Sequence, residues 1–129
     1  MEGKNQKILM MEEDRFLRKI YRNKMNLAGF DFVEATNGLE GLNKVTSEKP
    51  DLVLLDVILS RKSGFDVLIE MRKNPETRET PVIILSNLSQ ESDIKKGLSL
   101  GAQEYLVKSE VSLSDVVEKT KELLGRTRV

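Results

Sequence analysis

Polar side chains that could carry phosphoryl and metal chemistry follow four short apolar runs of this sequence. An acidic triplet comes after the first run and single polar residues follow three later runs: Glu12–Asp14, Asp56, Ser86 and Lys108. Adjacent carboxylates repel one another, so they either raise a pKa or bind a cation. Oxygen donors of this kind suit Mg²⁺, Ca²⁺ or Mn²⁺, while a hydroxyl and an ammonium group can hold an anion. Together these residue types describe a phosphoryl-transfer site with an aspartate nucleophile.

Asp56 is the strongest candidate for the nucleophile, because it ends the apolar run Leu52–Leu55 that we place at the centre of a sheet. Each residue also has a simpler explanation when taken alone. An Asp after a strand often caps a turn, and an acidic triplet complements the N-terminus of a helix. A lone Ser or Lys is commonly a loop or surface residue. The conjunction at four strand ends is what favours a shared site.

Composition narrows the chemistry further. The 129 residues include no Cys and no His, which excludes disulfides, zinc–thiolate sites, a histidine general base and a histidine phosphoryl carrier. The 21 basic and 21 acidic residues cancel, so we expect neither nucleic acid nor a membrane as a partner. Apolar runs reach only about six residues, too few to span a bilayer. The polar segment Met1–Lys7 lacks the apolar core of a secretory signal, so we expect a cytoplasmic protein.

Apolar runs of strand length alternate with segments of helical period. The expected strands span residues 8–11, 31–35, 52–55, 81–85 and 105–107, and the expected helices lie between Asp14 and Gly29, between Gly38 and Pro50, and over 64–73, 89–100 and 112–124. Strands that are apolar throughout are buried on both faces. This alternation predicts a parallel sheet with right-handed crossovers.

We therefore expect an α/β fold: a five-stranded parallel sheet of order 2-1-3-4-5, flavodoxin-like and doubly wound, with helices on both faces. One domain would cover residues 1–129, with a core from about 7 to 124 and a solvated tail, Arg126–Val129. Ligands of such sheets bind beyond the carboxyl ends of the strands, where the polar residues above would meet.

The stretches KILMMEED, KPDLVLLD, SGFDVL, TPVIILSN and GAQEYLVKS resemble those of response-regulator receiver domains, the CheY-like phosphoacceptors of two-component signalling. The resemblance extends from about Lys7 to about Leu124. The steps of 30 residues from Asp56 to Ser86 and 22 from Ser86 to Lys108 are common in such domains.

The resemblance implies how a phosphoryl group would be accepted. Asp56 would receive it from a phosphohistidine on a sensor histidine kinase or a histidine phosphotransfer protein. Mg²⁺, or Mn²⁺ in its place, would be held by Glu13, by Asp56 and by the backbone carbonyl of Ile58, with Glu12 acting through water. Ser86 would donate a hydrogen bond to one phosphoryl oxygen.

The resemblance also implies a switch. Lys108 would pair with another phosphoryl oxygen, and Tyr105 would move inward together with Ser86. The face formed by the expected helix 89–100, the strand 105–107 and the helix 112–124 would then bind a different downstream protein, whose identity the sequence does not give. Such a chain is not an enzyme beyond its own phosphoryl acceptance and autodephosphorylation.

Four residues depart from the family pattern: Glu13 replaces Asp, Ser60 and Ser109 replace Pro, and Asn87 replaces a small residue. The longer side chain of Glu13 predicts altered metal geometry and lower metal affinity. Ser60 predicts a looser loop, and Asn87 predicts altered access to Ser86. With Ser109 after the site lysine, the family's cis peptide bond would have to form without proline, at a cost of about 2.5–4 kcal/mol.

Two alternatives to the switch follow from these features. The departures at Glu13, Ser60 and Ser109 leave open a phosphorylation-independent interaction module with a degenerate acid pocket. A nucleotide or flavin enzyme is disfavoured, because no glycine-rich phosphate loop follows the first strand.

If the chain is a switch, the apolar residues Ile58 and Leu88 could shield an aspartyl phosphate, which predicts slow autodephosphorylation.

Overall fold

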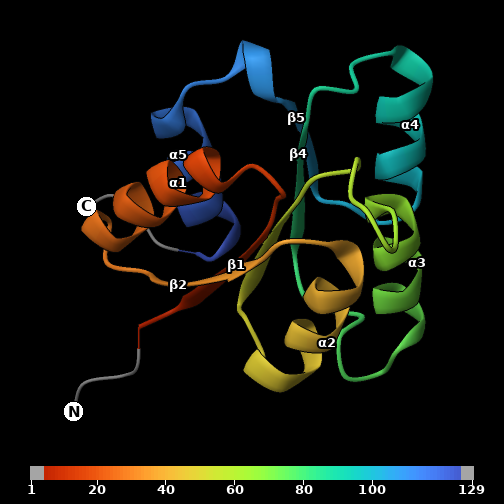
Figure 1. Ribbon diagram of the computed structural model, residues 1–129, viewed down its shortest axis with the longest axis horizontal. Coiled ribbons are helices and arrows are strands. Elements are labelled where there is room, and N and C mark those ends of the chain that lie inside the picture. The colour runs from red at the N-terminus through yellow and green to blue at the C-terminus, as the bar shows by residue number, and fades with distance from the viewer. Residues whose placement is uncertain (1–4, 126–129) are drawn as a thin grey trace.

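The computed structural model describes residues 5–125 and contains one parallel sheet (Figure 1). The strands are β1 (Lys7–Met11), β2 (Asp31–Ala35), β3 (Leu52–Leu55), β4 (Val82–Ser86) and β5 (Glu104–Val107). Their spatial order is β2-β1-β3-β4-β5, which confirms the predicted fold class. The N-terminal residues 1–4 and the tail 126–129 lie outside the described residues.

A helix follows each strand, and side-chain caps begin most of them. The helices are α1 (Arg15–Leu27), α2 (Gly38–Glu48), α3 (Gly64–Lys73), α4 (Glu91–Ser99) and α5 (Leu113–Leu123), with a single 3₁₀ turn at Lys108–Glu110. The side chains of Asp14, Asn37, Ser63 and Ser112 accept hydrogen bonds from backbone amides of the first helical turn. These short polar residues therefore fix where the chain leaves the sheet edge and turns helical.

The helices form two layers around the sheet (Figure 1). Alternate residues of each strand point to opposite faces, so the sheet feeds two separate hydrophobic clusters. Leu9, Leu55 and Ile84 belong to the cluster beneath α2 and α3, and Met10 and Leu54 to the cluster beneath α1 and α5. Each fully buried side chain of this size contributes about 1.5–3 kcal/mol, and together they hold the sheet edge that carries the polar residues.

Several boundaries differ from the prediction by one or two residues, and two of them lie next to the polar residues at the sheet edge. β4 runs one residue further, so Ser86 is its last residue rather than the first residue after it. α4 begins at Glu91 rather than Ser89. The intervening loop stays non-helical because both backbone polar groups of Leu88 are bound elsewhere: its amide donates to Oγ of Ser86 and its carbonyl accepts from the hydroxyl of Tyr105.

The buried side of α1 differs from the one that the helical spacing of its apolar residues indicates. Phe16 and Leu27 fit the helical spacing but are 76% and 86% exposed, whereas Arg18, Tyr21 and Met25 are buried. A buried arginine replaces one apolar position of the helix, because its guanidinium finds acceptors beneath α1.

The backbone of residues 5–125 has no cis peptide bond, so the Lys108–Ser109 bond is trans. In the same range, no helix combines the length and the hydropathy that crossing a membrane requires.

Candidate functional site

The register of the parallel strands brings the predicted site residues to one edge of the sheet. Met11 lies beside Leu55, so the residues that follow them, Glu12 and Asp56, leave the sheet at the same level. Ser86 lies beside Val107, and Lys108 comes directly after it. The strands therefore bring together side chains that are up to 96 residues apart in the sequence, Glu12 and Lys108.

The ammonium group of Lys108 joins two carboxylates. Its Nζ atom lies 2.6 Å from Oε1 of Glu12 and 2.8 Å from Oδ2 of Asp56. The three side chains are only 17%, 5% and 7% exposed, respectively. When all three are ionised, two negative charges face one positive charge, so the cluster carries a net charge of −1. A partly desolvated site of this charge attracts a further cation.

Burial and ion pairing act against each other in this cluster. Burial is the largest influence on Glu12 and raises its pKa, and the contact with Lys108 only partly offsets it. Burial alone would lower the pKa of Lys108, but its contacts with the carboxylates of Asp56 and Glu12 together outweigh burial and raise it. Lys108 is therefore a cation at neutral pH in this cluster.

The Asp56 carboxylate is fixed on both oxygens. Oδ2 accepts from Lys108, and Oδ1 accepts from the backbone amide of Ile58 at 3.2 Å. Behind it, α3 starts so close that a Cβ atom on Gly64 would lie 2.1 Å from the Asp56 carbonyl oxygen. The amide of Gly64 also donates to the carbonyl of Val57 at 2.8 Å. The missing side chain at Gly64 lets the helix pin the backbone that carries Asp56.

Glu12 has one oxygen that is suited to a cation. Its Oε2 atom accepts from the amide of Asp14 at 2.9 Å. Its Oε1 atom is buried and forms an ion pair with Lys108, but the geometry of that contact is not that of a hydrogen bond. Among the buried side-chain nitrogen and oxygen atoms of residues 5–125, Oε1 of Glu12 alone has no hydrogen-bond partner. Mg²⁺ often takes only one or two carboxylates and completes its shell with water and phosphate oxygens. Glu12 and Asp56 fit such a cation.

Glu13 lies apart from these two carboxylates. Its side chain is exposed, and its Oε2 atom accepts a hydrogen bond from the backbone amide of Ser60. Contacts with the Ser60 hydroxyl and then with the Ser60 amide lower the Glu13 pKa. Within the described residues, no three acidic side chains gather closely enough to form a cation cage. Metal ligation by Glu13, and by the backbone carbonyl of Ile58, stays a prediction.

Ser86 and Tyr105 are linked through the backbone of Leu88. Oγ of the fully buried Ser86 accepts from the Leu88 amide at 3.3 Å, and the Tyr105 hydroxyl donates to the Leu88 carbonyl at 2.7 Å. Burial, followed by the charges of Asp93 and Asp56, raises the Tyr105 pKa, so the hydroxyl remains a donor. A displacement of Ser86 would therefore pull on the tyrosine through residue 88.

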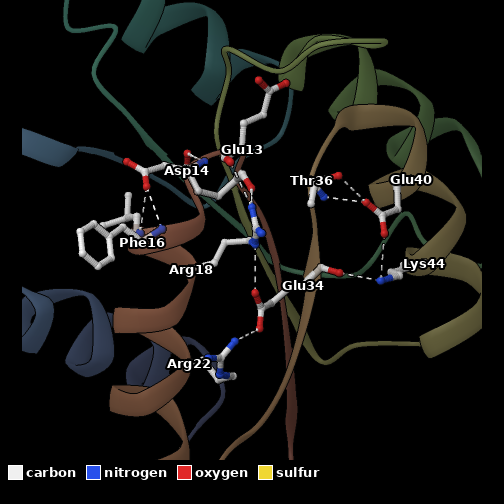
Figure 2. Close-up of polar contacts among 11 residues, drawn as sticks. Glu13, Asp14, Phe16, Arg18, Arg22, Glu34, Thr36, Glu40 and Lys44 are labelled. Carbon is white, nitrogen blue, oxygen red and sulfur yellow. Dashed lines mark hydrogen bonds and ion pairs between the residues drawn. The ribbon is translucent and has the colours of Figure 1, made fainter.

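The sequence analysis missed a cluster that supports the acidic loop after β1. Nη1 of Arg18 donates to the backbone carbonyls of Glu12 and Glu13 at 2.8 and 3.1 Å, and its Nε donates to Glu34 at 2.9 Å. Figure 2 shows this guanidinium between the loop and Glu34, with Arg22 on the other carboxylate oxygen. The available signal was the i, i+3, i+7 spacing of Arg18, Tyr21 and Met25.

Charge balance holds this cluster together. Burial alone would raise the pKa of Glu34, but the contacts with Arg22 and Arg18 outweigh burial and lower it. The carbonyl of Glu34 accepts from Lys44 of α2 at 2.6 Å, so the residue ties α1 and α2 to β2. Arg18 is thus a positioning residue for Glu12 and Glu13.

We predict that Arg18→Met lowers the free energy of unfolding by about 2 kcal/mol at pH 7, since three hydrogen bonds are lost. Arg22→Met is the matched control, because Arg22 shares Glu34 but does not touch the loop; it should cost less than about 0.5 kcal/mol. Urea unfolding measures both, and amide resonances of Glu12 and Glu13 should move only in Arg18→Met.

The loss of unfolding free energy in Arg18→Met should depend on pH. Because the folded-state pKa of Glu34 is lowered, its stabilising contribution is present above its unfolded pKa, about 4.3, and is lost as the pH falls through the folded value. The difference between wild type and Arg18→Met should shrink below about pH 4. An equal difference at pH 7 and pH 3 would contradict this account.

We also predict that Gly64→Ala costs about 1–3 kcal/mol and moves the Asp56 backbone, because the new methyl group overlaps its carbonyl oxygen. Ser63→Ala serves as the comparison. It removes the cap of the same helix, at about 1 kcal/mol, without touching Asp56. A shift of the Asp56 amide resonance in both variants, or in neither, would contradict the prediction.

Comparison with known proteins agrees with this geometry. The sequence-family model named response regulator receiver domain matches residues 8–121 of this chain. The alkaline phosphatase synthesis transcriptional regulatory protein PhoP of Bacillus subtilis is 31% identical over 125 residues, 97% of this chain and 51% of that protein. The DNA-binding dual master transcriptional regulator RpaA of Synechocystis is 30% identical over 121 residues, 94% of this chain and 50% of that protein.

Solved structures superpose closely. The receiver domain of the Francisella response regulator 1452 superposes with a TM-score of 0.87 at 28% sequence identity. The match covers 96% of this chain and 100% of that one. The Mn²⁺-bound form of response regulator Rcp1 has a TM-score of 0.82 at 24% identity, covering 96% and 97%.

The chain spans about half the length of the curated relatives it matches. Those relatives are transcriptional regulators, and RpaA is described as DNA-binding, so they give no support to the prediction that nucleic acid is not a partner. The family match over most of the chain and the CheY-like order of the sheet lead to one conclusion: this chain belongs to the response regulator receiver domain family of two-component signalling.

Proposed function

We propose that this chain is a phosphorylation-operated switch whose acceptor is Asp56. The observation that carries the proposal is the buried Asp56 carboxylate at the carboxyl edge of the sheet, with Lys108 2.8 Å from one oxygen. A carboxylate oxygen would attack phosphorus, the P–N bond to a donor imidazole would break, and the electron pair would stay on that imidazole. With no His in the chain, that imidazole belongs to a sensor histidine kinase or a histidine phosphotransfer protein.

Mg²⁺ or Mn²⁺ would be held by Glu12 and Asp56, with Glu13 and the Ile58 carbonyl as the further ligands that the family resemblance implies. A bound divalent ion supplies positive charge against the phosphoryl oxygens. Two observations support this assignment: the Oε1 atom of Glu12 accepts no hydrogen bond, and the structural neighbour Rcp1 binds Mn²⁺. The ammonium group of Lys108 would turn from the carboxylate toward a phosphoryl oxygen and keep its charge.

The readout would pass through Leu88. A phosphoryl group on Asp56 adds strong acceptor oxygens, and Ser86 is the buried hydroxyl at the same sheet edge. Movement of Ser86 toward the phosphoryl group would carry Leu88 and the bonded Tyr105 with it. Tyr105 packs against Gly97, where a Cβ atom would lie 2.8 Å from the ring, so α4 would have to respond. The surface of α4, β5 and α5 would then bind a downstream partner.

The first test uses beryllofluoride, which mimics a phosphoryl group, together with Mg²⁺. We expect amide resonances near Asp56, Ser86, Leu88 and Tyr105 to shift in wild type. The control is Asp56→Asn, which should show no shift while keeping its stability, because it relieves one of two neighbouring negative charges. Unchanged spectra in a folded wild-type protein would instead favour a phosphorylation-independent interaction module.

The second test concerns the lifetime of the aspartyl phosphate. Ile58 is 60% exposed beside Asp56, and Leu88 packs partly against the core; neither side chain can orient an attacking water by hydrogen bonding. We predict slow autodephosphorylation, which the double variant Ile58→Asn, Leu88→Glu should accelerate by about tenfold or more. Decay of the phosphorylated protein measures it, with Ile58→Val as the apolar control. An unchanged rate would reject shielding.

A further inference from the structure

Two loops at the site are joined by one hydrogen bond between residues that both depart from the family pattern. Glu13 follows β1 and Ser60 follows β3, and the Ser60 amide donates to the Glu13 carboxylate. The Ser60 carbonyl accepts from the amide of Gly38 at 3.1 Å, so the loop is held from a second side. Figure 2 shows the Glu13 side chain directed away from Arg18 and Glu34, while its backbone carbonyl faces Arg18.

Both departures from the family pattern take part in this contact. Proline has no backbone N–H, so a chain with Pro at position 60 could not donate this hydrogen bond. Aspartate at position 13 would be one methylene shorter than the glutamate whose carboxylate reaches the Ser60 amide. Ser60 therefore does more than replace proline in a loop: it supplies the donor that the longer Glu13 reaches.

This hydrogen bond and metal ligation are alternatives for one side chain. Glu12 and Asp56 face Lys108, whereas Glu13 is bound across the gap to Ser60 and does not gather with them. To reach a cation held by Glu12 and Asp56, the Glu13 carboxylate would have to leave the Ser60 amide. Hydrogen bonds to a charged acceptor are stronger than neutral ones, so leaving costs metal affinity.

We propose that the Glu13–Ser60 hydrogen bond is a latch that closes the β1–α1 and β3–α3 loops on each other without a cation, and that a divalent cation opens it by drawing Glu13 to Glu12 and Asp56. The inference rests on the proposed metal site. It assigns to Ser60 a role in setting the metal affinity of the switch.

The test is a set of Mg²⁺ titrations followed by amide resonances at the site. Ser60→Pro, which removes the donor, should raise the Mg²⁺ affinity about five-fold. Ser60→Ala keeps the amide but removes the hydroxyl, which also contacts Glu13, so it should gain less Mg²⁺ affinity than Ser60→Pro. Glu13→Asp leaves residue 60 untouched and should also gain affinity, which keeps the test valid if Ser60→Pro folds poorly.

A background variant separates the latch from a general change of the loop. In Glu13→Gln the side chain has no charge to offer the cation, so adding Ser60→Pro should leave the affinity unchanged. An equal gain in that background would overturn the latch. A second readout needs no metal-loaded activity: the Ser60 amide should exchange with solvent more slowly in metal-free wild type than in Glu13→Ala, and Mg²⁺ should remove the difference.

The outcomes distinguish the two proposals. If wild type binds Mg²⁺ and neither Ser60→Pro nor Glu13→Asp binds it more tightly, the latch is wrong and the phosphoacceptor proposal stands. If only Ser60→Pro binds Mg²⁺, the cation does not open the latch of the wild-type protein, and that part of the inference is wrong. If no variant binds Mg²⁺ or responds to beryllofluoride, the metal site and the latch fail together.

Discussion

The contact on which the rest of this site depends is the single ammonium group shared by two buried carboxylates. Without Lys108, Glu12 and Asp56 would face each other as like charges at a place with little access to water, an arrangement that costs several kcal/mol. With Lys108 the cluster is stable but still carries one negative charge in excess. The excess negative charge leaves the cluster able to take up a further cation, as the proposed switch requires.

Holding such a cluster in place requires support from outside it. Arg18 of α1 donates hydrogen bonds to the backbone carbonyls of Glu12 and Glu13 in the loop after β1. The Glu34 carboxylate pairs with Arg18 and fixes the orientation of its guanidinium group. Gly64 lets α3 press against the backbone of Asp56. These residues limit the freedom of the two loops that carry Glu12, Glu13 and Asp56, in line with the precision that charged sites demand.

The fold could be predicted almost completely because its signals are local and repeated. Apolar runs of four or five residues specify buried strands, and Asp14, Asn37 and Ser63 mark helix starts. The residues at the strand ends were also predictable, since parallel strands must align their carboxyl ends. The start of α4 was not, because Leu88 is held by Ser86 and Tyr105, which are contacts between separate elements.

The direction in which individual side chains point could not be predicted from the sequence either. Glu12 and Glu13 are chemically identical neighbours, yet one is buried beside Lys108 and the other is exposed on the Ser60 amide. Burial of Arg18 was equally hidden, because an arginine on an apolar side of a helix is only explained once its carbonyl acceptors are known.

The link between Ser86 and Tyr105 has a consequence for substitutions at position 88. Both of its hydrogen bonds use the backbone of Leu88, one through the amide and one through the carbonyl. A substitution at position 88 that keeps the backbone in place would preserve both hydrogen bonds, although the Leu88 side chain also packs against the core. In the proposed switch, substitutions at this position would change the lifetime of the aspartyl phosphate while both hydrogen bonds of the residue 88 backbone stay in place.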